Sequence, residues 1–384
     1  MSKKQAFLFI VLLGLVSLFA DITYEGARSI VGPFMKTLGA SAAVLGFAVG
    51  LGELIGYAFR LVSGVLSDVT RKYWLFTILG YVMNLLAVPM LAFAGNWQVA
   101  LALILMERFG KALRTPARDT LLSFAAEEIG TGKSFGIHEA LDQVGAILGP
   151  LSITFALAFG KGYRFCFFVL FIPALVALAL LLTARIVFPS ARTEKVKKDR
   201  FTDQNLGRTY WFYLLVVSMI AFGFADFPLI AYHMKNFEIA KDFLVPAVYS
   251  LAMAVDAVSA LVFGYLFDKR GFSALLYPVL LSAFFPILSF SGYFPLIFAG
   301  TALWGIGMGA QESIMRAVVA KIVPQEKRGF AYGMFFTVYG VFWFLGSWIL
   351  GILYDTNRLY LILVSFFSQL MAFALLFRFK RTAG

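Results

Sequence analysis

The stretch GVLSDVTRKY, residues Gly64 to Tyr73, stands between two long apolar runs, and a shorter relative of it, GYLFDKRG, stands at Gly264 to Gly271. Gly64 and Asp68 in the first stretch correspond to Gly264 and Asp268 in the second at a constant offset. A polar motif that is used twice in this way indicates a chain built from two similar halves. The apolar runs on either side of the motif indicate what those halves are.

The composition identifies the solvent that surrounds most of the chain. Of the 384 residues, 61% are hydrophobic and 14% are charged, whereas a soluble domain is about half apolar and about a quarter charged. A water-soluble core of this length cannot bury so many apolar side chains, so the lipid bilayer is the expected solvent. The single cysteine, Cys166, excludes an internal disulfide and a cysteine-based metal site. The first apolar run is too long for a signal peptide and has no small-residue cleavage site after it, which predicts a retained transmembrane helix.

Apolar runs long enough to cross a bilayer recur twelve times along the chain. Helix is the only reasonable form for them in lipid, and they lack the alternation of a membrane β-strand. The predicted spans are residues 6–35, 41–67, 73–95, 97–126, 135–160, 163–188, 209–234, 243–267, 273–291, 293–321, 328–353 and 358–378.

One long polar break, PSARTEKVKKDRFTDQNLGR at residues 189–208, divides the spans six and six. It is charged, lacks apolar periodicity and begins with a proline, so it is predicted to be a solvated cytoplasmic linker. The expected fold is an all-α membrane protein with 12 transmembrane helices in two pseudo-symmetric six-helix bundles, residues 1–188 and 209–384.

Lysine and arginine are distributed unevenly between the two sides of the predicted spans. The chain ends, the linker and the short loops after the second, fourth, eighth and tenth spans carry most of them. The positive-inside rule therefore predicts a multi-pass protein of the cytoplasmic (inner) membrane with both termini in the cytoplasm. The net charge of +12 follows from this topology, and no soluble basic domain remains to bind nucleic acid.

The stretch LFADITYEGARSIVG, residues 18–32, places ionisable groups within an apolar run. Asp21, Glu25 and Arg28 are spaced i, i+4 and i+7, so they share one helix face. Charges that face lipid cost several kcal/mol each, so such a stripe is expected to face another stripe or a wet cavity. Further stripes are Glu53, Tyr57 and Arg60 in the second span, Glu107, Lys111, Arg114 and Arg118 in the fourth, and His138 and Asp142 in the fifth.

Carboxylates within a membrane span are candidates for carrying a proton. Removal from water favours the neutral form of a carboxyl group, and a nearby arginine favours the charged form. A helix movement that changes both the hydration of the carboxyl group and its distance from the arginine therefore makes it take up or release a proton. The proton-coupling candidates are Asp21, Glu25, Glu53 and Asp142; the alternative is permanent ion pairs that only hold helices together. The residues predicted to line a substrate cavity are Arg28, Tyr57, Arg60, Glu107, Arg108, Lys111, Gln143, Asp226 and Trp304.

The two histidines carry a weaker signal. His138 is expected to be a hydrogen-bonded structural group. His233 with Asp226 makes only a weak metal pair. No metal site, catalytic residue or cofactor is predicted.

Three motifs carry a resemblance to a known family. GVLSDVTRK resembles the loop 2–3 signature of the major facilitator superfamily, roughly G-x-L-x-D-x-x-G-R-K, with Thr70 in place of the third glycine. GAILGPL, residues 145–151, resembles the span-5 motif G-x-x-x-G-P associated in that superfamily with antiporters, with Leu151 and Ser152 in place of the usual Gly-Gly. ERFGKALRTPARD and FGIHEALDQVGAILGPL look like a prokaryotic branch of these permeases, and the resemblance covers the whole chain. The residues that belong to its motifs or gates are Gly64, Asp68, Arg71, Arg118, Asp119, Gly145, Gly149, Pro150, Asp268 and Arg316.

The loop motif also permits predictions about contacts. Gly64 is expected to allow close helix approach. Asp68 is expected to accept from helix N-terminal amides or to pair with Arg118, and Asp119 to meet Arg71 or Lys72, as a latch or as passive salt bridges. Pro150, Pro228 and Pro286 are predicted to mark breaks or kinks.

The function expected from these patterns is proton-coupled transport of a small organic molecule by alternating access, carried out by a monomer in lipid. Export by antiport of amphiphilic or drug-like compounds is favoured. The alternatives are proton-coupled symport or exchange of an organic anion, and transport of a lipid or a metal ion. An enzyme is not expected, since no nucleophile–base set stands out; a scramblase, receptor or scaffold is the remaining class.

Overall fold

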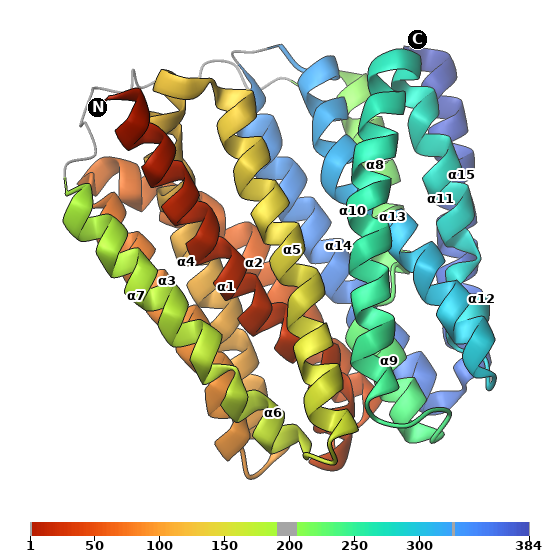
Figure 1. Ribbon diagram of the computed structural model, residues 1–384. Coiled ribbons are helices and arrows are strands. Elements are labelled where there is room, and N and C mark those ends of the chain that lie inside the picture. The colour runs from red at the N-terminus through yellow and green to blue at the C-terminus, as the bar shows by residue number, and fades with distance from the viewer. Residues whose placement is uncertain (1, 190–205, 325–326, 384) are drawn as a thin grey trace. The chain divides into compact units, whose positions relative to one another are not determined.

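The computed structural model describes residues 2–189, 206–324 and 327–383, and these residues form helices and short connections without strands (Figure 1). The first half of the chain contains α1 (Lys3–Thr37), α2 (Ala42–Thr70), α3 (Tyr73–Met90), η1 (Leu91–Phe93), α4 (Trp97–Ile129), α5 (Thr131–Ala158), α6 (Tyr163–Val169) and α7 (Phe171–Val187). The second half contains α8 (Arg208–Gly223), α9 (Phe227–Asn236), α10 (Leu244–Arg270), η2 (Gly271–Leu275), α11 (Leu276–Ala283), α12 (Phe285–Ser289), α13 (Phe294–Ile322), α14 (Arg328–Thr356) and α15 (Arg358–Ala383). Most of the predicted linker 189–208 lies outside the described residues.

The helices agree with the predicted all-α membrane fold. Within the described ranges, nine helical stretches are long and apolar enough to cross a membrane. One of them, Leu244–Ser289, covers two of the predicted spans, and α4 and α13 follow the two predicted spans that the nine leave out. Helix α4 is the least apolar of the long helices because its polar stripe runs through its middle.

Prolines mark two of the helix interruptions, as predicted. Pro228 lies in the first turn of α9, directly after the break that ends α8. Pro286 lies in the first turn of α12, after the break that ends α11. Pro150 lies inside α5, which continues through it without a break. An imino nitrogen has no hydrogen to donate, so proline is best tolerated where a helix begins.

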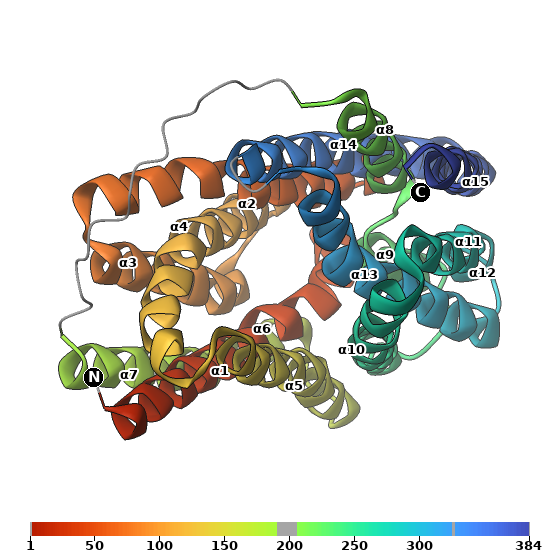
Figure 2. The same ribbon diagram turned by 90° about the horizontal axis from the view of Figure 1, so that it is seen from above.

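Contacts group the chain into two compact units. Unit 1 is Met1–Gly39, Ile55–Val196 and Asp242–Ser250, and unit 2 is Ala40–Leu54, Lys197–Lys241 and Leu251–Gly384. In unit 1, α1 packs against α5, α7 and α4, and α3 packs against α4 (Figures 1 and 2). In unit 2, α8 packs against α14 and α15, and α13 packs against α11 and α12. These units are groups of contacts, and the division into transport bundles at residues 1–188 and 209–384 stays a prediction.

Close packing joins α1 to α5 through glycine. A Cβ atom added at Gly149 would lie 2.6 Å from the carbonyl oxygen of Ile22 and 2.9 Å from the amide nitrogen of Gly26. A Cβ atom added at Gly145, one turn before Gly149 on α5, would also collide with the backbone of α1. These small residues let the two backbones touch. At Gly64, by contrast, an added Cβ would make an ordinary 3.5 Å contact with Pro116, so the prediction of a close approach there is wrong.

Candidate functional site

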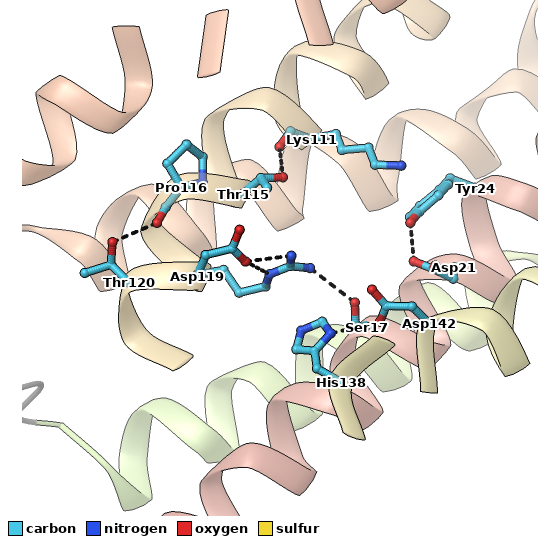
Figure 3. Close-up of polar contacts among 11 residues, drawn as sticks. Ser17, Asp21, Tyr24, Lys111, Thr115, Pro116, Asp119, Thr120, His138 and Asp142 are labelled. Atoms are coloured by element: carbon cyan, nitrogen blue, oxygen red, sulfur yellow. Dashed lines mark hydrogen bonds and ion pairs between the residues drawn. The ribbon is translucent and has the colours of Figure 1, made fainter. Parts of the chain in front are cut away.

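The first carboxylate of the candidate site is Asp21 on the polar face of α1. It is 6% exposed, and the hydroxyl of Tyr24, one turn further along the helix, donates a hydrogen bond to its Oδ1 (Figure 3). The charges that act on Asp21 include the carboxylate of Asp142 on α5 and the ammonium of Lys111 on α4. Three helices of unit 1 therefore bring charged groups to one buried carboxylate.

The second carboxylate of α1, Glu25, is held from α10. Its Oε2 accepts a hydrogen bond of 2.5 Å from the hydroxyl of Tyr249, and both side chains are buried. Tyr249 was not predicted as a site residue. A signal for it existed in the sequence, since Tyr249 and Asp256 are seven residues apart and share one face of α10.

A third carboxylate, Glu107 on α4, is paired on both sides. Its Oε1 accepts from Nδ2 of Asn84 at 2.7 Å, and its Oε2 lies 3.1 Å from Nε of Arg108. Asn84 also donates to the backbone oxygen of Glu107 at 3.1 Å, which ties α3 to α4. Sequence reasoning missed Asn84 because it is a single amide in an apolar span.

The pairs predicted between the loop and α4 are replaced by other contacts in this structure. Arg118 lies 2.7 Å from its neighbour Asp119 and donates to Ser17 on α1 at 3.2 Å. Asp68 instead accepts a hydrogen bond of 3.2 Å from the hydroxyl of Tyr73. Adjacent side chains can pair with little loss of conformational entropy, so Arg118 pairs with its neighbour Asp119 and the predicted contacts with Asp68 and Arg71 do not form.

The two members of the polar stripe on α5 lie next to each other within their own helix. His138 Nδ1 lies 3.1 Å from Asp142 Oδ1, an i, i+4 pair on the side of α5 that faces Ser17 (Figure 3). Nε2 of His138 is buried without a hydrogen-bond partner among the described residues, so the hydrogen-bonded structural role expected for His138 stays a prediction.

Aromatic faces hold the two remaining cations of α4. The ammonium of Lys111 lies 4.0 Å from the ring centroid of Tyr24, and Figure 3 shows the lysine extended toward that ring. The guanidinium of Arg114 lies 4.1 Å from the ring centroid of Tyr81 on α3. Such cation–π contacts contribute about 0.5–1 kcal/mol at exposed sites and about 2 kcal/mol or more when they are shielded from water.

Two of the cavity candidates belong to the interior of unit 2. Trp304 is fully buried and donates from Nε1 to the oxygen of Ala225 at 2.9 Å, which satisfies a carbonyl group left open by the break between α8 and α9. The place of Trp304 in a substrate cavity stays a prediction. Asp226, in the same break, accepts from Trp343 at 2.7 Å and from Ser347 at 2.8 Å.

The other candidates have more dispersed places. Glu53 is buried in unit 2, and the guanidinium of Arg60 lies 5.3 Å from the ring of Tyr57 in unit 1. Gln143 has a buried Oε1, and Arg28 has a buried Nε. At the motif positions of the second half, Asp268 is exposed and Arg316 donates to the Glu312 oxygen of its own helix.

His233 does not take part in a metal pair with Asp226. Its Nδ1 lies 3.0 Å from the hydroxyl of Tyr354, and its Nε2 lies 2.8 Å from the oxygen of Ser291. Both ring nitrogens are therefore already engaged with protein groups.

Charged side chains buried within helices long enough to cross a membrane are typical of transporters, pumps and channels. A profile of the Major Facilitator Superfamily matches residues 13–347, and the chain belongs to this family. The chain is accordingly a multi-pass membrane transporter and not an enzyme.

The chain is also similar to proteins of other organisms and, in its fold, to solved structures. The chain is 39% identical to "Uncharacterized protein Rv2265" of Mycobacterium tuberculosis, over 98% of this chain and 94% of that protein. It is 27% identical to "Uncharacterized MFS-type transporter MJ1317" of Methanocaldococcus jannaschii, over 90% of this chain and 88% of the relative. Its fold is similar to that of the nucleoside transporter NupG, with a TM-score of 0.76, 12% identity and 97% and 98% of the two chains covered. It is also similar to a bacterial homologue of the lysosomal transporter Spinster, with a TM-score of 0.75, 14% identity and 100% and 98% covered.

Proposed function

We propose that this chain is a proton-coupled secondary transporter that moves a small organic molecule by alternating access. Two bundles, residues 1–188 and 209–384, would move against each other with both termini in the cytoplasm. The driving force would be the proton gradient.

The observation that carries the proposal is the buried pair of carboxylates on one face of α1. Asp21 accepts from Tyr24, and Glu25 accepts from Tyr249, so each carboxylate is held by a phenol. A phenol–carboxylate contact keeps an oxygen partner whether or not the carboxyl group carries a proton. Lys111 supplies a positive charge whose distance from Asp21 depends on how α4 sits against α1. Movement of α4 would change the proton affinity of Asp21 through this distance.

The direction of transport and the substrate class are proposed from the sequence. Export by antiport of amphiphilic compounds rests on the motif GAILGPL and on the aromatic residues of the second half. The alternative, transport of an organic anion, is favoured by the cations of α4 and is developed below.

Proteoliposomes that contain the purified full-length protein and the pH dye pyranine provide the test. A panel of nucleosides, amino acids, organic acids and amphiphilic cations is added outside, and proton movement that depends on an added compound is recorded. We expect at least one compound to drive proton movement with the wild type, and the Asp21→Asn variant to lose the coupling. The Glu25→Gln variant is measured beside it. The matched control is Glu128→Gln, which removes an exposed carboxylate near the end of α4.

Two results would overturn the proposal. One is full proton coupling in both the Asp21→Asn and the Glu25→Gln variants. The other is transport of a panel compound by the wild type without any proton movement.

A further inference from the structure

Not every positively charged side chain on the polar stripe of α4 has a carboxylate as its direct partner. Arg108 is paired with Glu107, and Arg118 is paired with Asp119. Within the described parts of the chain, Arg114 has no ion pair, and its Nε and Nη1 have no hydrogen-bond partner. Its contacts are the rings of Tyr81 and Tyr24.

Arg114 is enclosed by unit 1. It is 1% exposed, and its guanidinium lies 4.1 Å from the ring centroid of Tyr81 and 5.9 Å from that of Tyr24. Helix α3 approaches α4 closely here, since a Cβ atom added at Gly80 would lie 2.6 Å from Cβ of Arg114. The hydroxyls of Tyr81 and Thr77 on α3 are also buried without hydrogen-bond partners among the described residues. Unused donors from two helices therefore occur in one part of the bundle.

A buried guanidinium without a counter-charge is strongly unfavourable, and a contact with an aromatic ring offsets only part of that penalty. An arginine in this state is suited to an anion that presents two oxygens side by side, because its planar, rigid fork of donors matches a carboxylate or phosphate group. The ammonium of Lys111 lies over the other ring that Arg114 contacts, that of Tyr24, and adds a second positive charge.

We propose that Arg114 binds the carboxylate or phosphate group of the transported molecule, so that the substrate is an organic anion; this inference rests on the transport function proposed above. Lys111 contributes the second charge, and Tyr81 contributes a hydroxyl donor.

An anion at this place interacts with the proton on α1. Lys111, the second charge of this site, also acts on Asp21, so an anion bound beside Lys111 is repelled when that carboxylate is ionised and accepted when it is protonated. The charges that act on Asp21 are those of Lys111 on α4, Asp142 on α5 and Glu25 on its own helix, and Arg114 acts on the neighbouring Tyr24. Proton and anion then favour each other's binding, which corresponds to co-transport and not to exchange.

The test is ligand binding by the purified full-length protein, read as a shift in melting temperature and as a dissociation constant. The probes are matched pairs of an anion and its neutral analogue: benzoate and benzamide, succinate and succinamide, glucose 6-phosphate and glucose, and AMP and adenosine. Inorganic phosphate and dioctanoyl phosphatidylglycerol are added, because a free anion and a lipid headgroup present the same chemistry. The variants are Arg114→Gln, Arg114→Lys and the control Arg164→Gln, whose guanidinium donates to the oxygens of Ala92 and Ala94 in a loop.

We expect at least one anion to raise the melting temperature of the wild type while its neutral analogue does not. Arg114→Gln should weaken binding of that anion at least tenfold, Arg114→Lys at least threefold, and Arg164→Gln less than twofold. If phosphatidylglycerol is the only ligand that meets these criteria, the anion site is upheld and the transported anion is a lipid. If Arg114→Gln does not fold, the proposal is judged from the wild type, by comparing the binding of each anion with that of its neutral analogue.

The proposal is overturned if no anion of the panel binds, if a neutral analogue binds as tightly as its anion, or if Arg114→Gln binds within twofold of the wild type. Binding is measured without a gradient, so its outcome is separate from proton coupling. Intact anion binding together with absent proton movement would remove the proposed coupling and leave the anion site.

Discussion

Replacement of Gly149 by alanine tests the packing that brings the α1 carboxylates toward α5. Alanine favours a helix interior over glycine by about 1 kcal/mol. Against this gain, the new methyl group would lie 2.6 Å from the oxygen of Ile22, a backbone atom that cannot rotate away. Overpacking of this kind costs about 1–3 kcal/mol, so the net change in the free energy of unfolding is a loss of up to about 2 kcal/mol.

Gly136 on the same helix provides the matched control, because an added Cβ there meets nothing within 4 Å. Both substitutions gain the same helix preference, so their difference isolates the steric term of about 1–3 kcal/mol. The assay is thermal unfolding of each purified variant in detergent, with urea titration for the free energies. We expect Gly136→Ala to be at least as stable as the wild type and Gly149→Ala to be less stable than Gly136→Ala. Equal stability of the two variants would refute the close approach of α1 and α5.

Three further substitutions test single contacts. Tyr249→Phe removes the hydroxyl that donates to Glu25 and should lower the free energy of unfolding by about 1.5–3 kcal/mol when the carboxylate is ionised, and an unchanged urea midpoint would contradict the contact. Asp355→Ala removes the carboxylate that accepts hydrogen bonds from the first two backbone amides of α2, at 3.0 and 2.7 Å. It should lower the free energy of unfolding by about 0.5–2 kcal/mol, whereas Asp355→Asn should retain most of the stability. Equal losses of stability in both variants would argue against a capping role. Asn84→Ala leaves Glu107 without its amide donor and should cost about 1–3 kcal/mol in the same titration, a result that wild-type stability would exclude.

Much of the fold was predictable because its signals are local. A span of apolar residues must become a helix in lipid wherever its neighbours lie, since its backbone groups find partners only within the segment. The predicted spans 6–35 and 97–126 therefore correspond closely to α1 and α4. Pro228 and Pro286 marked helix starts for the same reason, because the missing N–H acts on the turn that contains it.

The polar stripes were predictable, but their partners were not. Spacing i, i+4 placed Asp21 and Glu25 on one face of α1 from the sequence alone. The sequence contains no comparable rule that joins Glu25 to Tyr249, which is 224 residues away, since that contact depends on the rotation and register of α1 and α10.

The sequence by itself determined the solvent, the helices and the faces on which charges lie. The tertiary structure alone decided which charge meets which group: Arg118 turns to Asp119 and not to Asp68, Trp304 closes a helix break, and Arg114 is left among aromatic rings. The physical reason is range. Hydrophobic transfer and helix hydrogen bonding act within a segment, whereas an ion pair or hydrogen bond between helices needs two surfaces brought to within about 3 Å of each other.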